Sequence, residues 1–335
     1  MNLKGWIEHD GARLSPTDLE RMLKEEPEAL KECGGEFLLT WDGCTARDAF
    51  GIMPGPVPPG TRCCGGRVVA RIAPDPPPCT LEEAIITAVS LRSDEGVVAF
   101  SGGVDSGLIA GLAHLPCVAV GIAGSHDIVW AEEAARLMGL DLEVVTPTEE
   151  EVAEALARVV RVIPDPANPV EASIATTLFF VTAWAGEQGH TRILAGQGAD
   201  ELFGGYARYL SSPDLAAELE RDVADHGRQR TRDQAVAALH GAYFSMPYLD
   251  VQVVRAAQAI PAGEKVRGGV RKRPLREVAE RHIPIEVARA EKKAMQYGSG
   301  IWRTIQRLAR QNGYRRVANY LETLEIGRAS CRERV

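Results

Sequence analysis

The stretch GVVAFSGGVDSGLIAGLAHL, residues 96–115, decides the fold class of this chain. Its first five residues form a short apolar run, which we expect to be a buried strand. Its last eleven residues are typical of a helix, and Ser101, Gly102 and Gly103 lie between the two. The stretch therefore predicts a strand, a tight glycine turn and a helix in immediate succession.

The same alternation continues through the following hundred residues. We expect strands at 117–123, 141–147 and 191–196, and helices at 127–140, 149–163 and 172–189. Strands that alternate with helices predict right-handed crossovers and an α/β fold whose mostly parallel sheet has helices on both faces. The strand signal fades after residue 210, which predicts a helical C-terminal part.

Two proline-rich stretches, 54–60 and 74–78, divide the N-terminal part of the chain. Proline fixes φ and lacks an N–H donor, so we expect turns or linkers there. Thr80 and Glu83 have the spacing of a capping box, which predicts a helix start just after the second stretch. The expected divisions are a small, mainly β domain at 1–79, an α/β domain at 80–322, and a tail at 323–335 that we treat as partly a cloning remnant.

The composition is that of a soluble globular protein, with 45% hydrophobic and 25% charged residues among 335. The formal net charge of −8 argues against wrapping nucleic acid as the main role. No apolar run approaches the roughly 18–20 residues that span a bilayer, and the first sixteen residues contain no apolar signal region. We therefore expect a cytoplasmic protein without a membrane or nucleic-acid partner.

Five of the seven cysteines fall within the first 79 residues. Their number is odd, no C-x-x-C pair occurs, and the adjacent Cys63 and Cys64 are poorly spaced for chelation. We therefore expect buried structural thiols, with a small zinc site as the alternative.

The turn at 101–103 has the makings of a phosphate cradle. In open α/β sheets, ligands bind outside the carboxyl ends of the strands, where this turn is expected. Two glycines allow close backbone approach, Ser101 and Ser106 add hydroxyl donors, and a helix N-terminus favours an anion. The turn is neither G-x-x-x-x-G-K-[ST] nor G-x-G-x-x-G, so an ordinary strand-to-helix turn is the alternative interpretation.

Asp105 changes the balance between these interpretations. A carboxylate inside an anion cradle repels phosphate unless a divalent cation lies between them, and Mg²⁺ suits this arrangement. A second carboxylate follows the strand expected at 191–196, in the loop LAGQGADELFGGY at 194–206. The spacing therefore predicts that Asp105 and Asp200 share a Mg²⁺ ion at one edge of the sheet.

These motifs together resemble a known family. SGGVDS at 101–106 resembles the pyrophosphate loop of the N-type ATP pyrophosphatases, whose fold is adenine nucleotide alpha-hydrolase-like. GQGADELFGGY, MPYLDVQVVRAAQAIP, VRKRPLREVAERHIP and EKKAMQYGSG follow in the order found in the synthetase domain of class B asparagine synthetases. The resemblance extends over most of residues 80–310.

The resemblance implies ATP and Mg²⁺ as cofactors and assigns roles by position. The residues that would contact ATP are Phe100, Ser101, Gly102, Gly103, Asp105, Ser106, Val120, Ala195 and Gly196. Asp105 and Asp200 would bind the metal. Lys292, with the adjacent Lys293 as the alternative, would stabilise charge on the α-phosphorus.

The implied reaction is ATP-dependent amide formation in two steps. A carboxylate, aspartate in the family, attacks ATP and releases pyrophosphate, and ammonia or an amine then displaces AMP. One departure concerns Gln197, where most family members have a glutamate. Glutamine has no charge and cannot act as a base, so the identity of the acceptor carboxylate stays open.

The second departure is at the N-terminus. Segments 33–43 and 46–55 resemble parts of the family's glutaminase domain, at less than half its usual length. The family nucleophile is a cysteine exposed after Met1, whereas Asn2 stands here, and Cys33 and Cys44 are internal. We therefore expect no glutamine hydrolysis, with nitrogen from free ammonia, an amine or a separate glutaminase subunit. The domain could also serve as a homodimer surface.

Two other function classes compete with this hypothesis. One is a nucleic-acid-modifying member of the same superfamily, such as a tRNA thiolase or lysidine synthetase, which the negative charge and the missing C-x-x-C disfavour. The other is a non-catalytic ATP-binding regulator, which the retained Asp105, Asp200 and Lys292 disfavour.

Overall fold

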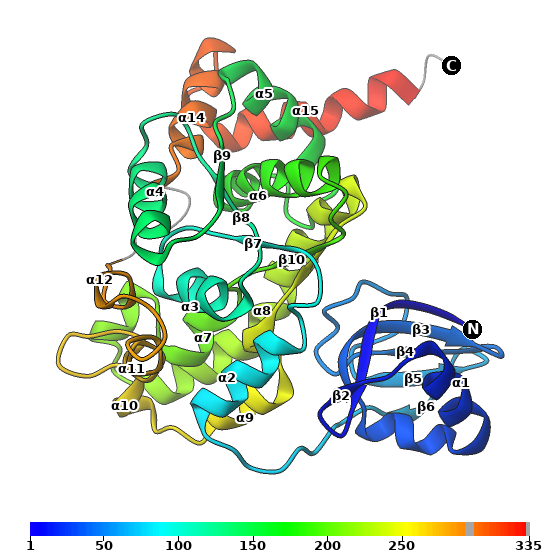
Figure 1. The fold of residues 1–335 in the computed structure, drawn as a ribbon. Coiled ribbons are helices and arrows are strands. Elements are labelled where there is room, and N and C mark those ends of the chain that lie inside the picture. Colours follow the sequence, from blue (N-terminus) through cyan, green and yellow to red (C-terminus); the bar gives the residue numbers. More distant parts are fainter. Residues whose placement is uncertain (292–297, 333–335) are drawn as a thin grey trace. The chain divides into compact units, whose positions relative to one another are not determined.

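The computed structural model describes residues 1–291 and 298–332, and the side chains as far as residue 325. The chain forms two compact units, each built from separate stretches of sequence (Figure 1). The first unit comprises Met1–Asp94, Gly196–Ala224 and Ser245–Val278, and the second comprises Glu95–Ala195, Asp225–Phe244 and Ala279–Val335. No helix in the described part of the chain is long and apolar enough to cross a membrane.

The N-terminal part of the first unit is an antiparallel sheet of order β2-β1-β3-β4-β5-β6. The small, mainly β character predicted for residues 1–79 is therefore confirmed. The elements are β1 (Asn2–His9), β2 (Ala12–Arg13), α1 (Pro16–Glu25), η1 (Pro27–Glu32), β3 (Gly34–Trp41), β4 (Cys44–Arg47), β5 (Thr61–Cys64) and β6 (Arg67–Arg71).

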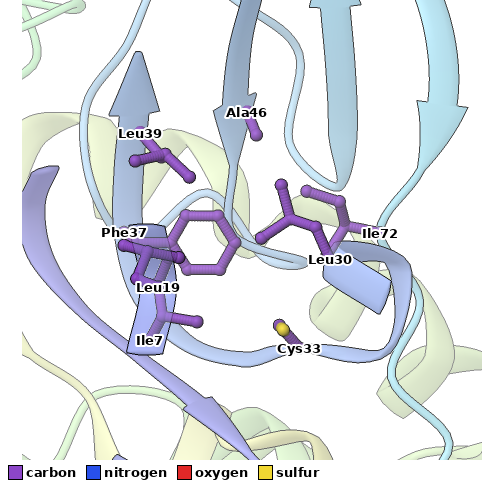
Figure 2. Close-up of a cluster of buried hydrophobic side chains, with 8 residues drawn as sticks. All are labelled: Ile7, Leu19, Leu30, Cys33, Phe37, Leu39, Ala46 and Ile72. Carbon is purple, nitrogen blue, oxygen red and sulfur yellow. The ribbon is translucent and has the colours of Figure 1, made fainter. Parts of the chain in front are cut away.

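A hydrophobic cluster lies on one face of this sheet (Figure 2). Strand residues Ile7, Phe37 and Leu39 meet Leu19 of α1, which begins at the N-cap Ser15. Fully burying one such side chain is worth roughly 1.5–3 kcal/mol, so this cluster anchors α1 on the sheet. The remaining members are Leu30, Cys33, Ala46 and Ile72.

The cysteines correct one expectation. Cys44 and Cys64 lie directly opposite each other on β4 and β5 and form a disulfide. Two of the thiols predicted from composition are therefore absent. Cys33, Cys63 and Cys117 are free and buried, as predicted.

The other elements of the first unit are mainly helical. As predicted, Thr80 and Glu83 form a capping box, and the helix that begins there ends at Ser90. The proline-rich stretch 74–78 is irregular, and Arg255 holds it by an ion pair to Asp75 and a hydrogen bond to the Pro76 carbonyl. The elements are α2 (Leu81–Ser90), α7 (Ala199–Phe203), η2 (Ala207–Ser211), η4 (Pro247–Leu249), α9 (Val251–Gln258), α10 (Ala262–Lys265) and α11 (Arg273–Ala279).

The second unit is built on a five-stranded sheet of order β11-β10-β7-β8-β9. Strand β7 pairs in parallel with β8 on one side and β10 on the other, and β8 pairs in parallel with β9. The predicted parallel α/β sheet is therefore confirmed, although each of the four expected strands is shorter than predicted. The fifth strand, β11, lies after residue 210, where no strand was predicted. The strands are β7 (Val97–Ala99), β8 (Cys117–Val120), β9 (Leu142–Val145), β10 (Arg192–Leu194) and β11 (Tyr243–Ser245).

The sheet order places a topological switch point at β7. The chain passes from β7 to β8 and β9 on one side and then returns to β10 on the other. In such sheets the ligand crevice opens at the carboxyl ends of the strands beside the switch. The helices are α3 (Val104–Ala113), α4 (His126–Met138), α5 (Glu149–Val159), α6 (Pro169–Glu187), η3 (Ala238–His240), α12 (Ile285–Ala288), α14 (Ile301–Gln311) and α15 (Val317–Arg332), with α8 (Leu215–Ala237) running from the first unit into the second.

A buried carboxylate in the first unit predicts a pH-dependent stability. Asp48 accepts hydrogen bonds from the backbone N–H groups of Ile52 and Met53, and burial raises the pKa of Asp48 to about 6. The unfolded chain releases this proton near pH 4, whereas the folded protein keeps it up to about pH 6. The contribution of Asp48 to the free energy of unfolding therefore falls as pH rises from about 4 to 6. We expect Asp48→Asn to remove roughly 2 kcal/mol of that pH dependence. Urea midpoints at pH 4.5 and 7 in both proteins measure it, and parallel pH profiles would contradict it.

Candidate active site

The turn after β7 is held closed by two serines. The Ser101 backbone N–H donates to Ser106 Oγ at 3.1 Å, and the two hydroxyl oxygens lie 3.1 Å apart. Ser106 Oγ also donates to the Gly103 carbonyl at 3.4 Å. The predicted cradle residues thus form one hydrogen-bonded turn, with Phe100 buried behind it.

Gly102 sits in a position that other residues cannot occupy without strain. Its φ is +72°, and a Cβ there would lie 2.8 Å from the Trp130 ring. The Trp130 indole N–H donates to the Gly102 carbonyl at 2.8 Å. Trp130 of α4 therefore fixes the orientation of the Gly102 carbonyl. The peptide groups that follow in the turn are oriented with it.

Helix α3 begins at the N-cap Gly103, where no side chain makes a capping hydrogen bond. The first N–H groups of a helix lack partners within the helix, so they are suited to an anion. Asp105 lies in this first turn with 4% of its surface exposed, and Ser106 is equally buried. The cradle therefore combines main-chain donors with one buried carboxylate.

The carboxyl end of β8 contacts the segment that follows residue 297. Val120 ends this strand, and the next two residues, Gly121 and Ile122, turn towards α4. The Ile122 N–H donates to the Ser299 carbonyl at 2.8 Å, and a Cβ on Gly121 would lie 3.0 Å from that same oxygen. The end of the predicted lysine-bearing segment, at Ser299, thus lies against the turn that follows β8. Lys292 and Lys293 themselves fall outside the described residues.

The acidic loop after β10 is built around left-handed glycines. Gly198, with φ +89°, is the N-cap of α7, and Gly204, with φ +76°, ends that helix. Asp200 lies in its first turn, whereas Glu201 is buried and accepts a hydrogen bond from the Tyr206 hydroxyl. The two adjacent carboxylates therefore differ in role, and Glu201 stabilises the loop.

Asp200 forms an ion pair with Lys272, a residue that the sequence analysis did not single out. The Lys272 side chain is 5% exposed, and a Cβ on Gly205 would lie 2.2 Å from it and 1.9 Å from the carboxylate. The neighbouring Arg271 donates to the Gly205 carbonyl at 2.7 Å. A lysine side chain thus pairs with the residue predicted to bind the metal. Lys272 lies in a segment that resembles the family, but nothing in the sequence indicated its contact with Asp200.

The predicted site residues divide between the two units. The cradle, Val120 and Ala195 belong to the second unit, whereas Gly196, Gln197 and Asp200 belong to the first. Because Asp105 and Asp200 are in different units, their shared metal site stays a prediction. Within the described ranges, no cluster of three or more His, Cys, Asp or Glu side chains could hold a metal ion.

A family model described as asparagine synthase matches residues 80–235 and 226–323, which include the cradle, the acidic loop and Lys272. The chain belongs to the asparagine synthase family. The family resemblance inferred from the motifs is therefore confirmed.

Individual relatives agree with this assignment. A Methanocaldococcus jannaschii protein named asparagine synthetase 1 is 31% identical over 290 residues, covering 73% of this chain and 53% of that protein. Asparagine synthetase B of Escherichia coli is 26% identical over 246 residues, or 66% and 44% of the two chains. Carboxyethyl-arginine β-lactam-synthase of Streptomyces clavuligerus is 29% identical over 241 residues, or 70% and 46%. The chain spans about half the length of these curated relatives.

The geometry of the turn predicts the effect of Gly102→Ala. The new Cβ meets the Trp130 ring at 2.8 Å, so the turn must open, and we expect ATP binding to weaken at least tenfold, or about 1.4 kcal/mol. Gly139→Ala is a matched control, because Gly139 has φ +63° but nothing within 4 Å of an added Cβ. Calorimetric titration with ATP compares the two variants, and equal affinities would contradict the assigned cradle.

Proposed function

We propose that this chain is an ATP-dependent amide ligase that activates a carboxylate as an acyl-adenylate and transfers it to ammonia or an amine. The observation that supports this most is the Ser101–Ser106 turn, held closed at the switch point of a parallel sheet in a member of the asparagine synthase family. Such a turn offers main-chain N–H groups to phosphate oxygens.

ATP would bind with its pyrophosphate on residues 101–106. Val120 at the end of β8 and the Ala195–Gly196 backbone after β10 would face the adenine side. The cradle provides preorganised donors for the charge that develops as pyrophosphate leaves. The Ser101 N–H and the two serine hydroxyls would exchange their hydrogen bonds within the turn for phosphate oxygens.

The carboxylates of Asp105 and Asp200 are suitable donors for Mg²⁺, which prefers oxygen ligands and usually keeps phosphate oxygens among them. The ion would neutralise charge between these carboxylates and the phosphates. Lys272, paired with Asp200, contributes a further positive charge beside the acidic loop. If Asp200 binds Mg²⁺, it would either share its carboxylate between the ion and Lys272 or exchange one cation for the other.

The chemistry proceeds in two displacements. A carboxylate oxygen of the acceptor attacks the α-phosphorus, the bond to the bridging oxygen breaks, and pyrophosphate leaves. The nitrogen donor then attacks the acyl carbon, AMP leaves with the former carboxylate oxygen, and the nitrogen loses a proton. The attacking carboxylate is already ionised at neutral pH and needs no base. Lys292 is proposed to stabilise the charge on the phosphorus during the first displacement.

Gln197 is the residue that leaves the identity of the acceptor carboxylate open. It lies in the loop with Asp200, where most family members have a glutamate, and its amide can donate and accept but cannot ionise. Aspartate is the first candidate acceptor. One relative is named for forming a β-lactam from carboxyethyl-arginine, so we extend the candidates to other carboxylic acids.

The nitrogen source is proposed to be ammonia, an amine or a separate glutaminase subunit. The described cysteines among residues 1–79 offer no exposed reactive thiol. Cys44 and Cys64 are bonded to each other, Cys63 is buried, and burial raises the pKa of Cys33 to about 12. The pKa of Cys79 is also raised by burial, which lowers its thiolate fraction.

Product analysis tests the proposed reaction. Wild-type protein with Mg²⁺, ATP and ammonium is incubated with a panel of carboxylic acids that includes aspartate. We expect AMP and pyrophosphate in equal amounts with at least one acid, and Asp105→Asn, which removes a charge near the phosphates, should lower the rate at least 100-fold. ADP and phosphate as products, or tight ATP binding without turnover on any acid, would contradict the proposal.

Gln197→Glu tests the departure from the family directly. If aspartate is the native acceptor, we expect the restored carboxylate to raise aspartate-dependent turnover several-fold. If another acid is native, turnover on that acid should fall instead. Unchanged kinetics with every acid would show that Gln197 does not contact the acceptor side.

A further inference from the structure

A buried carboxylate from the N-terminal sheet reaches into the helical part of the first unit. Glu36 on β3 has no solvent exposure. Its Oε1 accepts from Arg92 Nε at 2.8 Å and from the Met246 backbone N–H at 2.9 Å. Its Oε2 accepts from the Trp6 indole at 3.4 Å, on the neighbouring strand. One side chain of the N-terminal sheet thus satisfies a main-chain donor 210 residues away.

Arg92 extends this contact to the start of α9. Its guanidinium is 1% exposed and donates to the Ala88 carbonyl at 2.7 Å and to Asp250 Oδ2 at 3.0 Å. The other oxygen of Asp250 accepts from the Gln252 N–H and so caps α9. Segment 246–250 is therefore held at both ends by the same group of buried charges.

The same segment packs against the acidic loop. The Tyr248 ring, fully buried, meets the Phe203 ring of α7 edge to face, with centroids 6.1 Å apart. Leu249 lies so close to Gly198 that a Cβ there would be 2.7 Å from its side chain. Gly198 directly follows Gln197, and α7 contains Asp200. Segment 246–250 therefore packs against the loop that carries Gln197, assigned to the acceptor, and Asp200, assigned to the metal.

We propose that Glu36 is a positioning residue, through which the N-terminal sheet fixes segment 246–250 and thereby the Gln197–Asp200 loop. This inference rests on the proposed function for its kinetic consequence, but not for its structural one. Glu36→Gln removes the charge that pairs with Arg92 and replaces one of the two acceptor oxygens by an NH2 donor. The buried donors of Arg92, Met246 and Trp6 can then no longer all be satisfied, and such groups pull the surrounding backbone towards water. The N-terminal sheet then has a role in positioning the loop of residues 197–200.

The alternative is that Glu36 only stabilises the fold. Asp48 supplies the matched control, because this residue, which directly follows β4, is also a buried carboxylate with backbone N–H donors. Both of those donors, Ile52 and Met53, belong to the same N-terminal sheet domain. Glu36→Gln and Asp48→Asn each remove one buried carboxylate charge, and of these two residues only Glu36 contacts segment 246–250.

The test measures backbone exchange and kinetics in the two variants. By amide hydrogen exchange, we expect residues 196–206 and 246–250 to exchange at least tenfold faster in Glu36→Gln, and within twofold of wild type in Asp48→Asn. With the active acceptor, Glu36→Gln should raise the acceptor KM or lower kcat about tenfold, while the dissociation constant for ATP stays within twofold.

The outcomes separate the two proposals. Faster exchange confined to Glu36→Gln supports the positioning role even if no acid is turned over, in which case only the proposed reaction fails. Unchanged exchange at 196–206 in a folded Glu36→Gln protein overturns the positioning role. Equal loosening in both variants also overturns it, because it shows a general effect on stability.

Discussion

The ion pairs of Arg92 with Glu36 and Asp250 are the interaction on which the first unit depends. Arg92 is placed at the end of α2, Glu36 belongs to the N-terminal sheet, and Asp250 caps α9. Buried charges cost desolvation energy that only full hydrogen bonding offsets, and removing one partner typically costs about 3–5 kcal/mol. The cation must therefore remain enclosed by both carboxylates, which holds three segments that are remote in sequence in one arrangement. The Trp6 ring, 4.9 Å from the guanidinium carbon, closes the same cluster.

The parts of the fold that the sequence predicted are those with local signals. The strand, glycine turn and helix at 96–115 depend on neighbours a few residues apart, and β7 and α3 appear there as expected. The contacts that escaped prediction join distant residues. Cys44 meets Cys64 only because β4 and β5 pair in that register, and Asp200 meets Lys272, which is 72 positions later in the sequence. The hydropathy pattern likewise does not reveal the Glu36–Arg92 pair, because a charged residue reads the same in the sequence whether it is buried or exposed.

The two parts assigned to the proposed site differ in what holds them in place. The turn at 101–106 is fixed by its own hydrogen bonds and by Trp130. The acidic loop depends on supports from outside itself, namely Tyr248, Leu249 and Lys272. Gln197 lies in that second part. A family that uses one activation chemistry on different acceptors would be expected to vary this loop and its supports rather than the cradle.

The central claim is that the acceptor carboxylate is activated by bonding to the α-phosphorus of ATP. Oxygen tracing tests it most directly. The acid that supports turnover is labelled with ¹⁸O in its carboxylate, and the products of a reaction with ammonium are analysed by mass spectrometry. The account predicts one ¹⁸O atom in AMP and none in pyrophosphate, because the carboxylate oxygen leaves with the nucleotide. Unlabelled AMP, or label in inorganic phosphate, would contradict it.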